Sequence, residues 1–419
     1  MRPVLKPAMR RLWRGDATVQ LGADPEHGLV LDGLTEPAAN VLSLLDGTRD
    51  RRQVVAAAAT AGTREDDVRG LLDLLRSVAA LDDADARPER LDPAERARLA
   101  PDLASLTLLA TAPGEGVAQL ERRRAASVLV VGAGRVGSLV AALLGAAGVG
   151  HVAIRDERVA EAGDAVPGGV LPEDDGQPRA LAAMDAARRA GAASVDGALR
   201  PPDAADCAAA EFAVVAADGW LVPPAAVLDV LGAAGLSYLV AGVRETYGAV
   251  GPLVVPGRTS CPRCHDLHRA ARDPDWPLLA AQLASDRHEG VVACDVTLAA
   301  GVAALAAGQV LSHLAAPGLA RAVDATIELR LPEWTVRRRP WTAHPDCPCG
   351  AAPGAAGVGP PRAAPGAAGG GPSRAAPGAA TGAAQRGAPR AGGAGGMAGR
   401  DVGTSARVAG REARAAPRC

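Results

Sequence analysis

Aromatic side chains and lysine are scarce in this 419-residue chain. Phe, Tyr and Trp make up 2% of it against 48% hydrophobic residues, so the core must be built from Ala, Val and Leu. Lys6 is the only lysine, and arginine therefore carries nearly all the positive charge. The chain also has no excess of basic residues. Its net charge of −2 excludes a general nucleic-acid binder, because neutralising phosphates requires a basic surface.

An export signal is also missing. No apolar run follows Met1–Pro7, which favours a cytoplasmic location. In a reducing compartment, short spacings among the 7 cysteines favour a metal site or catalysis over disulfides. The segment Val296–Ala320 has no charged side chain and is long enough to span a membrane. Its Ala and Gly content and His313 indicate a buried core helix instead, so no membrane contact is expected.

The length allows two or three domains, and residues 1–88 have the pattern of a small α/β module. Alternating residues near Val19 and Leu31 predict a hairpin. Three short helices should follow, with Thr35 capping the first and Thr63 capping the third. The third helix should bury one apolar face, formed by Val68, Leu71, Leu72, Leu75 and Val78.

This order of elements resembles the PqqD-like winged-helix module that recognises peptides in ribosomal peptide biosynthesis. Trp13-Arg14-Gly15 and Leu44-Leu45-Asp46-Gly47-Thr48 carry the resemblance. It implies that a leader peptide adds a strand to the hairpin edge, where backbone hydrogen bonds give affinity. An unrelated small helical domain is the alternative.

A glycine turn opens the main domain, residues 127–350, after a connector at 89–126. Val128–Val131 predicts a buried strand, followed by the turn Gly132-Ala-Gly134-Arg135-Val-Gly137 and a helix. Gly132 permits the tight turn, Gly134 lets the backbone approach a phosphate, and Gly137 lets the helix pack on the strand. Asp156 ends the next strand, where a carboxylate can hold a ribose hydroxyl. A Rossmann half that binds nothing remains the alternative.

Two close cysteine pairs predict a structural zinc site. Their thiolates suit tetrahedral zinc, since each short turn supplies two ligands: Cys261, Cys264, Cys347 and Cys349. His344 is a spare ligand should one of the second pair fail to reach. His265 and His268 are expected at the surface. Unligated thiols are the alternative.

Together these motifs resemble the ThiF/MoeB/HesA family, relatives of the ubiquitin-activating enzymes, from about Arg122 to Gly350. Further matching segments are Gly176-Gln177-Pro178-Arg179, Val214-Val215-Ala216-Ala217-Asp218 and Ala293-Cys294-Asp295. The resemblance implies an α/β fold, a Rossmann-like, mostly parallel sheet with helices on both faces and a zinc-binding cysteine loop. It also implies ATP and magnesium as ligands, with Asp218 as the magnesium aspartate, adenylylation of a small carrier protein, and a homodimer.

The chain departs from that family around the triphosphate. The family's asparagine and arginine after the second strand are missing, and no asparagine occurs after Asn40. The window from Arg158 to Arg179 is acidic instead, and carboxylates repel a triphosphate. Arg179 replaces the family's lysine, and a planar guanidinium does not replace a point ammonium. Arg135 stands where glycine is usual and either crowds the phosphate or contacts it, so weak or lost ATP chemistry is expected.

Cys294 lies outside the quartet and just before a predicted helix. A helix N-terminus lowers the pKa of a thiol and makes it more nucleophilic. In sulfur-transferring family members, a cysteine at this place bonds covalently to the carrier. A small buried residue without chemistry is the alternative.

The tail, residues 351–419, is Gly, Ala, Pro and Arg with almost no large apolar residue, which predicts disorder. The whole pattern resembles ThiF-like leader-binding partners of YcaO cyclodehydratases, which make thiazoles and oxazoles in peptides. The alternative is an active adenylyltransferase that serves a ubiquitin-like sulfur carrier. A third interpretation is an NAD-linked oxidoreductase, but it gives the predicted zinc-binding cysteines no role.

Overall fold

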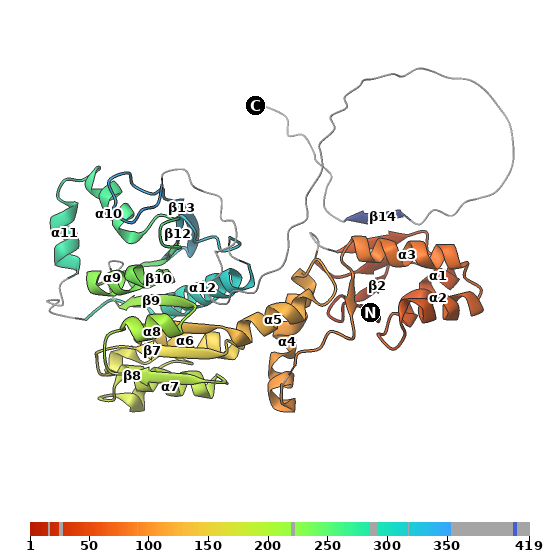
Figure 1. Cartoon of the computed structure of the whole chain (residues 1–419), viewed down its shortest axis with the longest axis horizontal. Coiled ribbons are helices and arrows are strands. Elements are labelled where there is room, and N and C mark those ends of the chain that lie inside the picture. Colours follow the sequence, from red (N-terminus) through yellow and green to blue (C-terminus); the bar gives the residue numbers. More distant parts are fainter. Residues whose placement is uncertain are drawn as a thin grey trace, which may run out of the picture.

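The computed structural model describes residues 1–15, 17–24, 28–89, 91–218, 223–284, 291–316, 318–352 and the backbone of 405–408. The side chains of residues 217 and 218 are outside this description. An N-terminal unit is joined by two helices to a larger unit built on one sheet (Figure 1).

The N-terminal unit combines a small antiparallel sheet with three helices. Its elements in chain order are β1 (Pro3–Leu5), β2 (Arg11–Trp13), β3 (Val19–Leu21), β4 (Leu29–Asp32), α1 (Glu36–Leu44), α2 (Arg51–Thr60), α3 (Glu65–Ser77) and β5 (Leu81–Asp83). Strands β2, β3 and β4 form consecutive antiparallel pairs, and β1 pairs with β5. The predicted hairpin and three helices are confirmed, whereas β1, β2 and β5 were not predicted.

Capping explains where these helices begin. The Thr35 side chain accepts from the backbone N–H of Ala38 at the start of α1, as predicted. The prediction for Thr63 is wrong, because α3 begins after Arg64 and no side chain caps it. The Thr63 hydroxyl is buried without a hydrogen-bond partner among the described residues. Helix α3 nevertheless buries Val68, Leu71, Leu72 and Leu75 of the expected apolar face in the core of the unit, and Val78 is partly buried against that core.

The connector is helical and packs on both units. Helices α4 (Pro93–Leu109) and α5 (Glu115–Ala125) form it, and their Leu99 and Leu120 are fully buried. Lys6 reaches the connector from the N-terminal unit, and its ammonium donates to the carbonyl of Ala110 at 2.7 Å. Burial lowers the pKa of Lys6.

The larger unit is built on an eight-stranded sheet. The strands are β6 (Ser127–Val131), β7 (His151–Arg155), β8 (Val195–Ala198), β9 (Phe212–Asp218), β10 (Ser237–Arg244), β11 (Tyr247–Val254), β12 (Ala325–Arg330) and β13 (Thr335–Pro340), in the spatial order β13-β12-β11-β10-β9-β6-β7-β8. The strands from β10 to β8 in that order are parallel, and β11, β12 and β13 extend the sheet antiparallel. This matches the expected mostly parallel α/β sheet.

Helices cover both faces of the sheet. The elements between the strands are α6 (Arg135–Ala146), α7 (Arg179–Arg189), α8 (Ala204–Ala209), α9 (Ala225–Ala233), α10 (Pro262–Ala270), α11 (Trp276–Leu283) and α12 (Val296–Ala315), with short 3-10 helices η1 (Ala162–Asp164) and η2 (Pro172–Asp174). Val128 and Val130 of β6 face a core shared with α6, α7 and α12. The alternate residue Leu129 faces a second core with α9 and the cysteines.

The uncharged segment forms a core helix, as expected. Helix α12 is the one described helix long and apolar enough to cross a membrane, by length and composition alone. Leu298, Val302, Ala306 and Val310 are fully buried along one side, in the core shared with α6 and the strands. Asp295 caps its start by accepting from two backbone N–H groups.

A buried ion cluster ties the end of β7 to α8. Arg155 donates to Asp206 at 2.6 and 2.9 Å and also contacts Asp196, while Arg200 binds Asp206 from outside. Burial alone would raise the pKa of Asp206, but the hydrogen bonds from Arg155 and Arg200 lower it below its usual value.

We expect the substitution Asp206→Ala to destabilise the protein by about 3 kcal/mol, because it strips a buried guanidinium of its main partner. The contribution of Asp206 is fully present above about pH 4 and declines as pH falls below that. Urea unfolding at pH 7 measures the loss. Asp185→Ala removes the exposed pair with Arg188 and is the control, and equal unfolding free energies for both variants would contradict the prediction.

The edge of β4 carries a strand from the far end of the chain. Strand β14 (Ser405–Val408) pairs antiparallel with β4, with Ser405 opposite Asp32 and Val408 opposite Leu29 (Figure 1). The sequence predicted no element in this region. The edge of the small sheet can therefore accept an extended segment.

Candidate functional site

The glycine turn lies at the carboxyl end of β6, as predicted. Gly132 has a φ of +93°, and a Cβ there would meet the carbonyl oxygen of Ala216 on β9 at 2.2 Å. A Cβ on Gly137 would meet the carbonyl oxygen of Gly132 at 1.9 Å. Gly134 is the N-cap residue of α6. Any side chain at Gly132 or Gly137 would therefore collide with backbone. Helix α6 begins at the same end of the sheet.

Asp156 holds the glycine turn from the next strand. One carboxylate oxygen accepts from the backbone N–H of Ala133 at 2.7 Å, and the other accepts from that of Arg158 at 2.9 Å. The residue is 7% exposed. Both oxygens already have a backbone partner, so Asp156 fixes the shape of the turn, and a ribose would have to share this carboxylate.

The Arg135 side chain extends from the glycine turn and contacts two other segments. Its Nε donates to the carbonyl of Gly163 at 2.7 Å, and a terminal nitrogen donates to the carbonyl of Cys294. The guanidinium therefore links η1 to the residue that precedes the cap of α12. Cys294 itself is half-buried and lies beside the core. The structure thus brings Arg135 and Cys294 together, 159 residues apart in sequence.

Arg179 is held by an internal carboxylate. Its Nε and one terminal nitrogen each donate to Asp164 at 2.7 Å, which is a two-pronged ion pair. Both side chains are largely buried, at 7% and 11% exposure. The sequence identified Asp164 as part of an acidic window but missed this pairing. The only sequence signal for this ion pair was the acidic residue Asp164 in a short turn before α7, which begins at Arg179.

Asp218 ends β9 in the described backbone, beside Val243 of β10. Its side chain is outside the described residues. The predicted magnesium role of Asp218 therefore stays a prediction.

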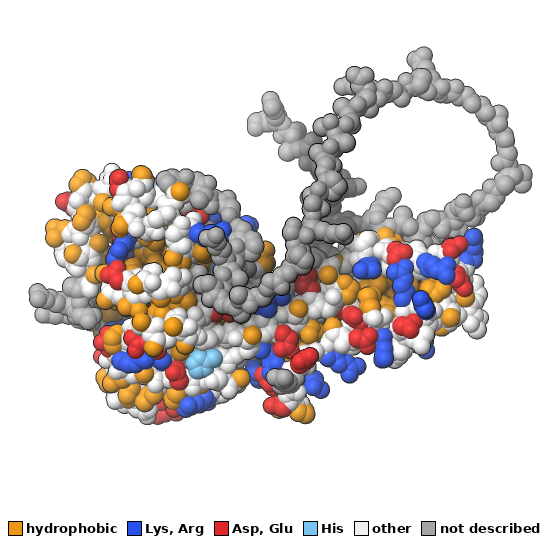
Figure 2. Space-filling model, in the orientation of Figure 1, with side chains coloured by type: hydrophobic (Ala, Val, Ile, Leu, Met, Phe, Trp, Pro, Cys, Tyr) orange, Lys and Arg blue, Asp and Glu red, His pale blue; other side chains and the backbone are white. Residues whose placement is uncertain are grey.

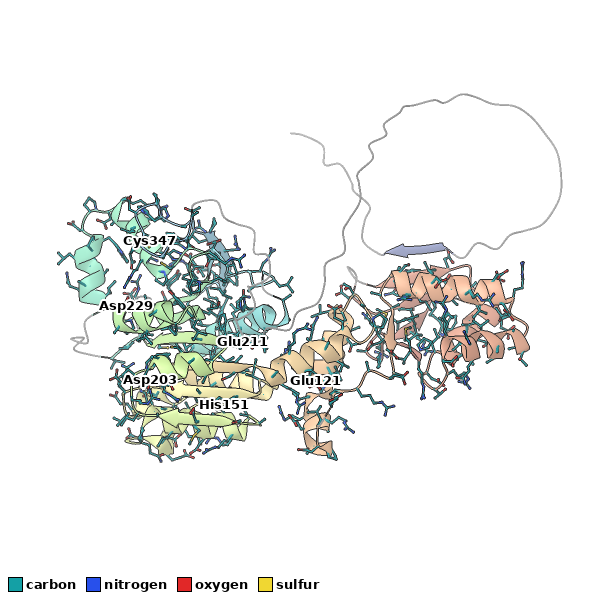
Figure 3. All side chains as sticks on the ribbon, in the orientation of Figure 1. Glu121, His151, Asp203, Glu211, Asp229 and Cys347 are labelled. Atoms are coloured by element: carbon teal, nitrogen blue, oxygen red, sulfur yellow. The ribbon has the colours of Figure 1, made fainter. Side chains whose placement is uncertain are left out.

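The four cysteines converge as predicted. Their sulfur atoms all lie within 4.8 Å of one another, and three separations are 3.8, 3.7 and 3.6 Å. Figure 3 shows Cys347 near α10, well away from His151 and Asp203. The spare ligand His344 is not in the cluster, and its Nδ1 accepts from the backbone N–H of Asp346 instead.

This arrangement fits a tetrahedral metal. Zinc–sulfur bonds of about 2.3 Å in a tetrahedron place the sulfurs roughly 3.8 Å apart. The hydrogen bond from Cys261 lowers the pKa of Cys264 below the usual value of a thiol. Zinc held here would join α10 to the segment after β13 and do no chemistry at the glycine turn.

His265 is placed differently from the prediction. It is 3% exposed and stacks on Trp341 with ring centroids 4.2 Å apart, instead of lying at the surface. Burial lowers its pKa to about 2, so the ring is neutral. The helix that carries Cys264 also carries His265, and the sequence gave no sign of the tryptophan that receives it.

The larger unit has a Rossmann-like α/β fold with a glycine turn at the carboxyl end of β6, and four of its cysteines lie close enough together to hold a metal ion. The ThiF family model matches residues 108–349, more than half of the chain, and the chain therefore belongs to the ThiF family. No curated protein is similar enough in sequence to count as a match.

Solved structures share this fold. Escherichia coli MccB with succinimide has a TM-score of 0.61 and 18% identity, covering 83% of this chain and 99% of that one. The microcin C7 biosynthetic enzyme MccB in complex with N-formylated MccA has a TM-score of 0.60 and 17% identity, covering 84% and 100%. PaaA has a TM-score of 0.60 and 15% identity, covering 80% and 98%. These alignments extend beyond residues 108–349, so the shared fold includes part of the N-terminal unit.

Proposed function

We propose that this ThiF-family protein binds a precursor leader peptide and presents it to a YcaO-type cyclodehydratase in thiazole or oxazole formation. Its N-terminal unit acts as a PqqD-like winged helix, and its nucleotide site has lost most of its ATP chemistry. The protein works in the cytoplasm, as a homodimer through the nucleotide unit. The MccB complexes with MccA support peptide binding by this architecture.

The edge of β4 carries the proposal most directly. Leu29 and Leu31 point into the core of the N-terminal unit, while Val30 is half-buried on the other face. An extended peptide at this edge gains backbone hydrogen bonds from β4 and side-chain contacts on one face. The pairing of Ser405–Val408 with β4 supports this mode, since those residues use the edge in the same way. Acidic and basic side chains are interspersed over α3 in the same unit (Figure 2), which favours recognition by shape over bulk charge.

The arginines beside the glycine turn support the loss of ATP chemistry. Arg179 is neutralised by Asp164, and Arg135 is bound to two backbone carbonyls. A triphosphate would have to displace these partners, and the cost of breaking a buried ion pair opposes that step.

The proposal predicts that the chain's own tail competes with the leader. Ala406→Pro combined with Arg407→Pro removes two adjacent N–H groups, one of which faces β4, and so breaks the pairing. We expect the variant to bind a fluorescein-labelled precursor peptide, taken from a neighbouring gene, at least fivefold more tightly than the unaltered full chain. Fluorescence anisotropy measures both affinities.

The matched control carries Ala383→Pro with Ala384→Pro in the same tail and should bind like the unaltered chain. Leader affinity that is the same in all three proteins would show that the leader does not use the β4 edge. No binding by any of them would overturn the proposed function itself.

An active adenylyltransferase for a ubiquitin-like sulfur carrier is the second candidate. It is favoured by the nearness of Arg135 to Cys294, because family members join nucleotide chemistry to a cysteine there. It also gives a role to Asp218 and Arg179.

A further inference from the structure

A polar cavity lies on the antiparallel part of the sheet. Its volume is about 240 Å³, and its lining includes neither the glycine turn nor the cysteine cluster. The β10–β11 turn, β12, the end of β13, α10 and α11 surround it. Four arginines and three aromatic side chains contribute to the lining: Arg244, Arg269, Arg330, Arg339, Tyr247, Trp276 and Trp341. The lining also holds two glutamates, so it has a surplus of positive charge.

Aromatic rings hold two of the guanidinium groups. Arg269 lies 4.9 Å from the ring centre of Trp276 and 5.2 Å from that of Trp341. Arg330 lies 4.5 Å from the ring centre of Tyr247. Such contacts fix the plane of a guanidinium. Arg269 also donates to Asp266 at 3.0 Å, whereas Arg330 forms a longer ion pair with Glu328 and is 55% exposed. Arg244 has no ion-pair partner within the described part of the chain, which leaves its charge available.

A buried carboxylate at the base of the cavity is only partly satisfied. Glu328 is 3% exposed, and its Oε1 lies 2.7 Å from Nε of Arg339. Its Oε2 has no hydrogen-bond partner among the described residues, and Nε of Arg339 also lacks a hydrogen bond of good geometry. Nη2 of Arg330 lies 4.0 Å from this Oε2, so Glu328 balances part of the charge of both Arg330 and Arg339. The oxygen has almost no accessible surface, and a ligand in the cavity would therefore meet the arginines rather than Glu328.

We propose that this cavity binds an acidic residue of an extended peptide. The peptide's side-chain carboxylate lies against Arg244 and Arg330. A bare inorganic anion satisfies the arginines but leaves the aromatic walls uncovered. The aromatic walls suit the apolar atoms of a peptide chain.

The cavity lies close to Cys294, so a peptide bound in it would have a defined position relative to that thiol. Glu245, in the turn that lines the cavity, forms a β-bridge with Cys294, whose carbonyl accepts from Arg135. An acidic residue bound here would leave the neighbouring peptide residues beside Cys294. The inference rests on the proposed function only for the source of the peptide, which would be the precursor whose leader occupies β4.

Direct binding of a short model peptide to the full chain tests the cavity. The probe is a fluorescein-labelled Gly-Asp-Glu-Asp-Gly amide, compared with its Gly-Asn-Gln-Asn-Gly counterpart, in fluorescence anisotropy at low salt. We expect the acidic peptide to bind at least tenfold more tightly than its amide counterpart. Arg330→Gln should weaken the acidic peptide at least fivefold, since a charged hydrogen bond is lost. Arg188→Gln on α7 is the control, because the two arginines are similarly exposed, at 54% and 55%.

The outcomes separate this site from others. Equal affinity for both peptides, or no effect of Arg330→Gln beyond that of Arg188→Gln, would overturn the proposal. Inorganic phosphate that competes at the same concentration as the acidic peptide would overturn the peptide as occupant. The tail variant with Ala406→Pro and Arg407→Pro should leave the affinity for the acidic peptide unchanged, so failure of the β4 site and failure of this cavity can be told apart.

Discussion

Replacing Cys264 with serine is expected to release bound zinc and to destabilise the nucleotide-binding unit by more than about 4 kcal/mol, the range reached when a structural metal is lost. Cys264 is fully buried within the core that includes Leu129, Val215 and Leu231. Three remaining thiols would hold zinc poorly and would stay buried next to a hydroxyl. Metal analysis of the purified protein and its thermal unfolding midpoint measure the two effects.

The control for this prediction is Cys207→Ser. Cys207 belongs to the same buried core but not to the cluster, and burial raises the pKa of its thiol. This variant should keep one zinc per chain and lose far less stability. Unaltered protein that contains no zinc after growth in zinc-supplemented medium, or equal melting of the two variants, would contradict the zinc assignment.

No ATP–pyrophosphate exchange above the protein-free background is expected from the purified chain with ATP and magnesium. A working adenylylating enzyme would exceed that background by many orders of magnitude. Two unit charges of like sign about 5 Å apart repel by about 3 kcal/mol at an effective dielectric constant of ~20, so each carboxylate near the triphosphate matters. Asp164 already takes the charge of Arg179.

The rival function makes the opposite prediction in the same assay. Tight ATP binding with exchange, and AMP release that depends on a small protein ending in Gly-Gly, would establish an adenylyltransferase. Asp218→Ala should then abolish AMP release, and Asp185→Ala on the exposed face of α7 should not. Such a result would overturn the proposed loss of ATP chemistry. It would not test the proposed leader binding at the edge of β4, which the anisotropy assay measures separately.

The sequence by itself determined the features that depend on residues close together in the chain. Gly132 and Gly137 mark a turn in which any side chain would collide with backbone, and such a requirement is visible in the chain itself. The cysteine spacings predicted the cluster of four thiols in the same way, because each short turn brings two sulfur atoms together. The apolar run at Val296–Ala315 determined a core helix.

Tertiary structure alone decided which charges meet. The hydrogen bond of Arg135 to the carbonyl of Cys294 and the ion pair of Arg155 with Asp206 join elements far apart in the chain. The stacking of His265 on Trp341 spans 76 positions of sequence. The pairing of Ser405–Val408 with β4 is of the same kind. Side-chain periodicity and capping act over a few residues, whereas electrostatic and edge-strand partners are selected by the packing of elements that are distant in the chain.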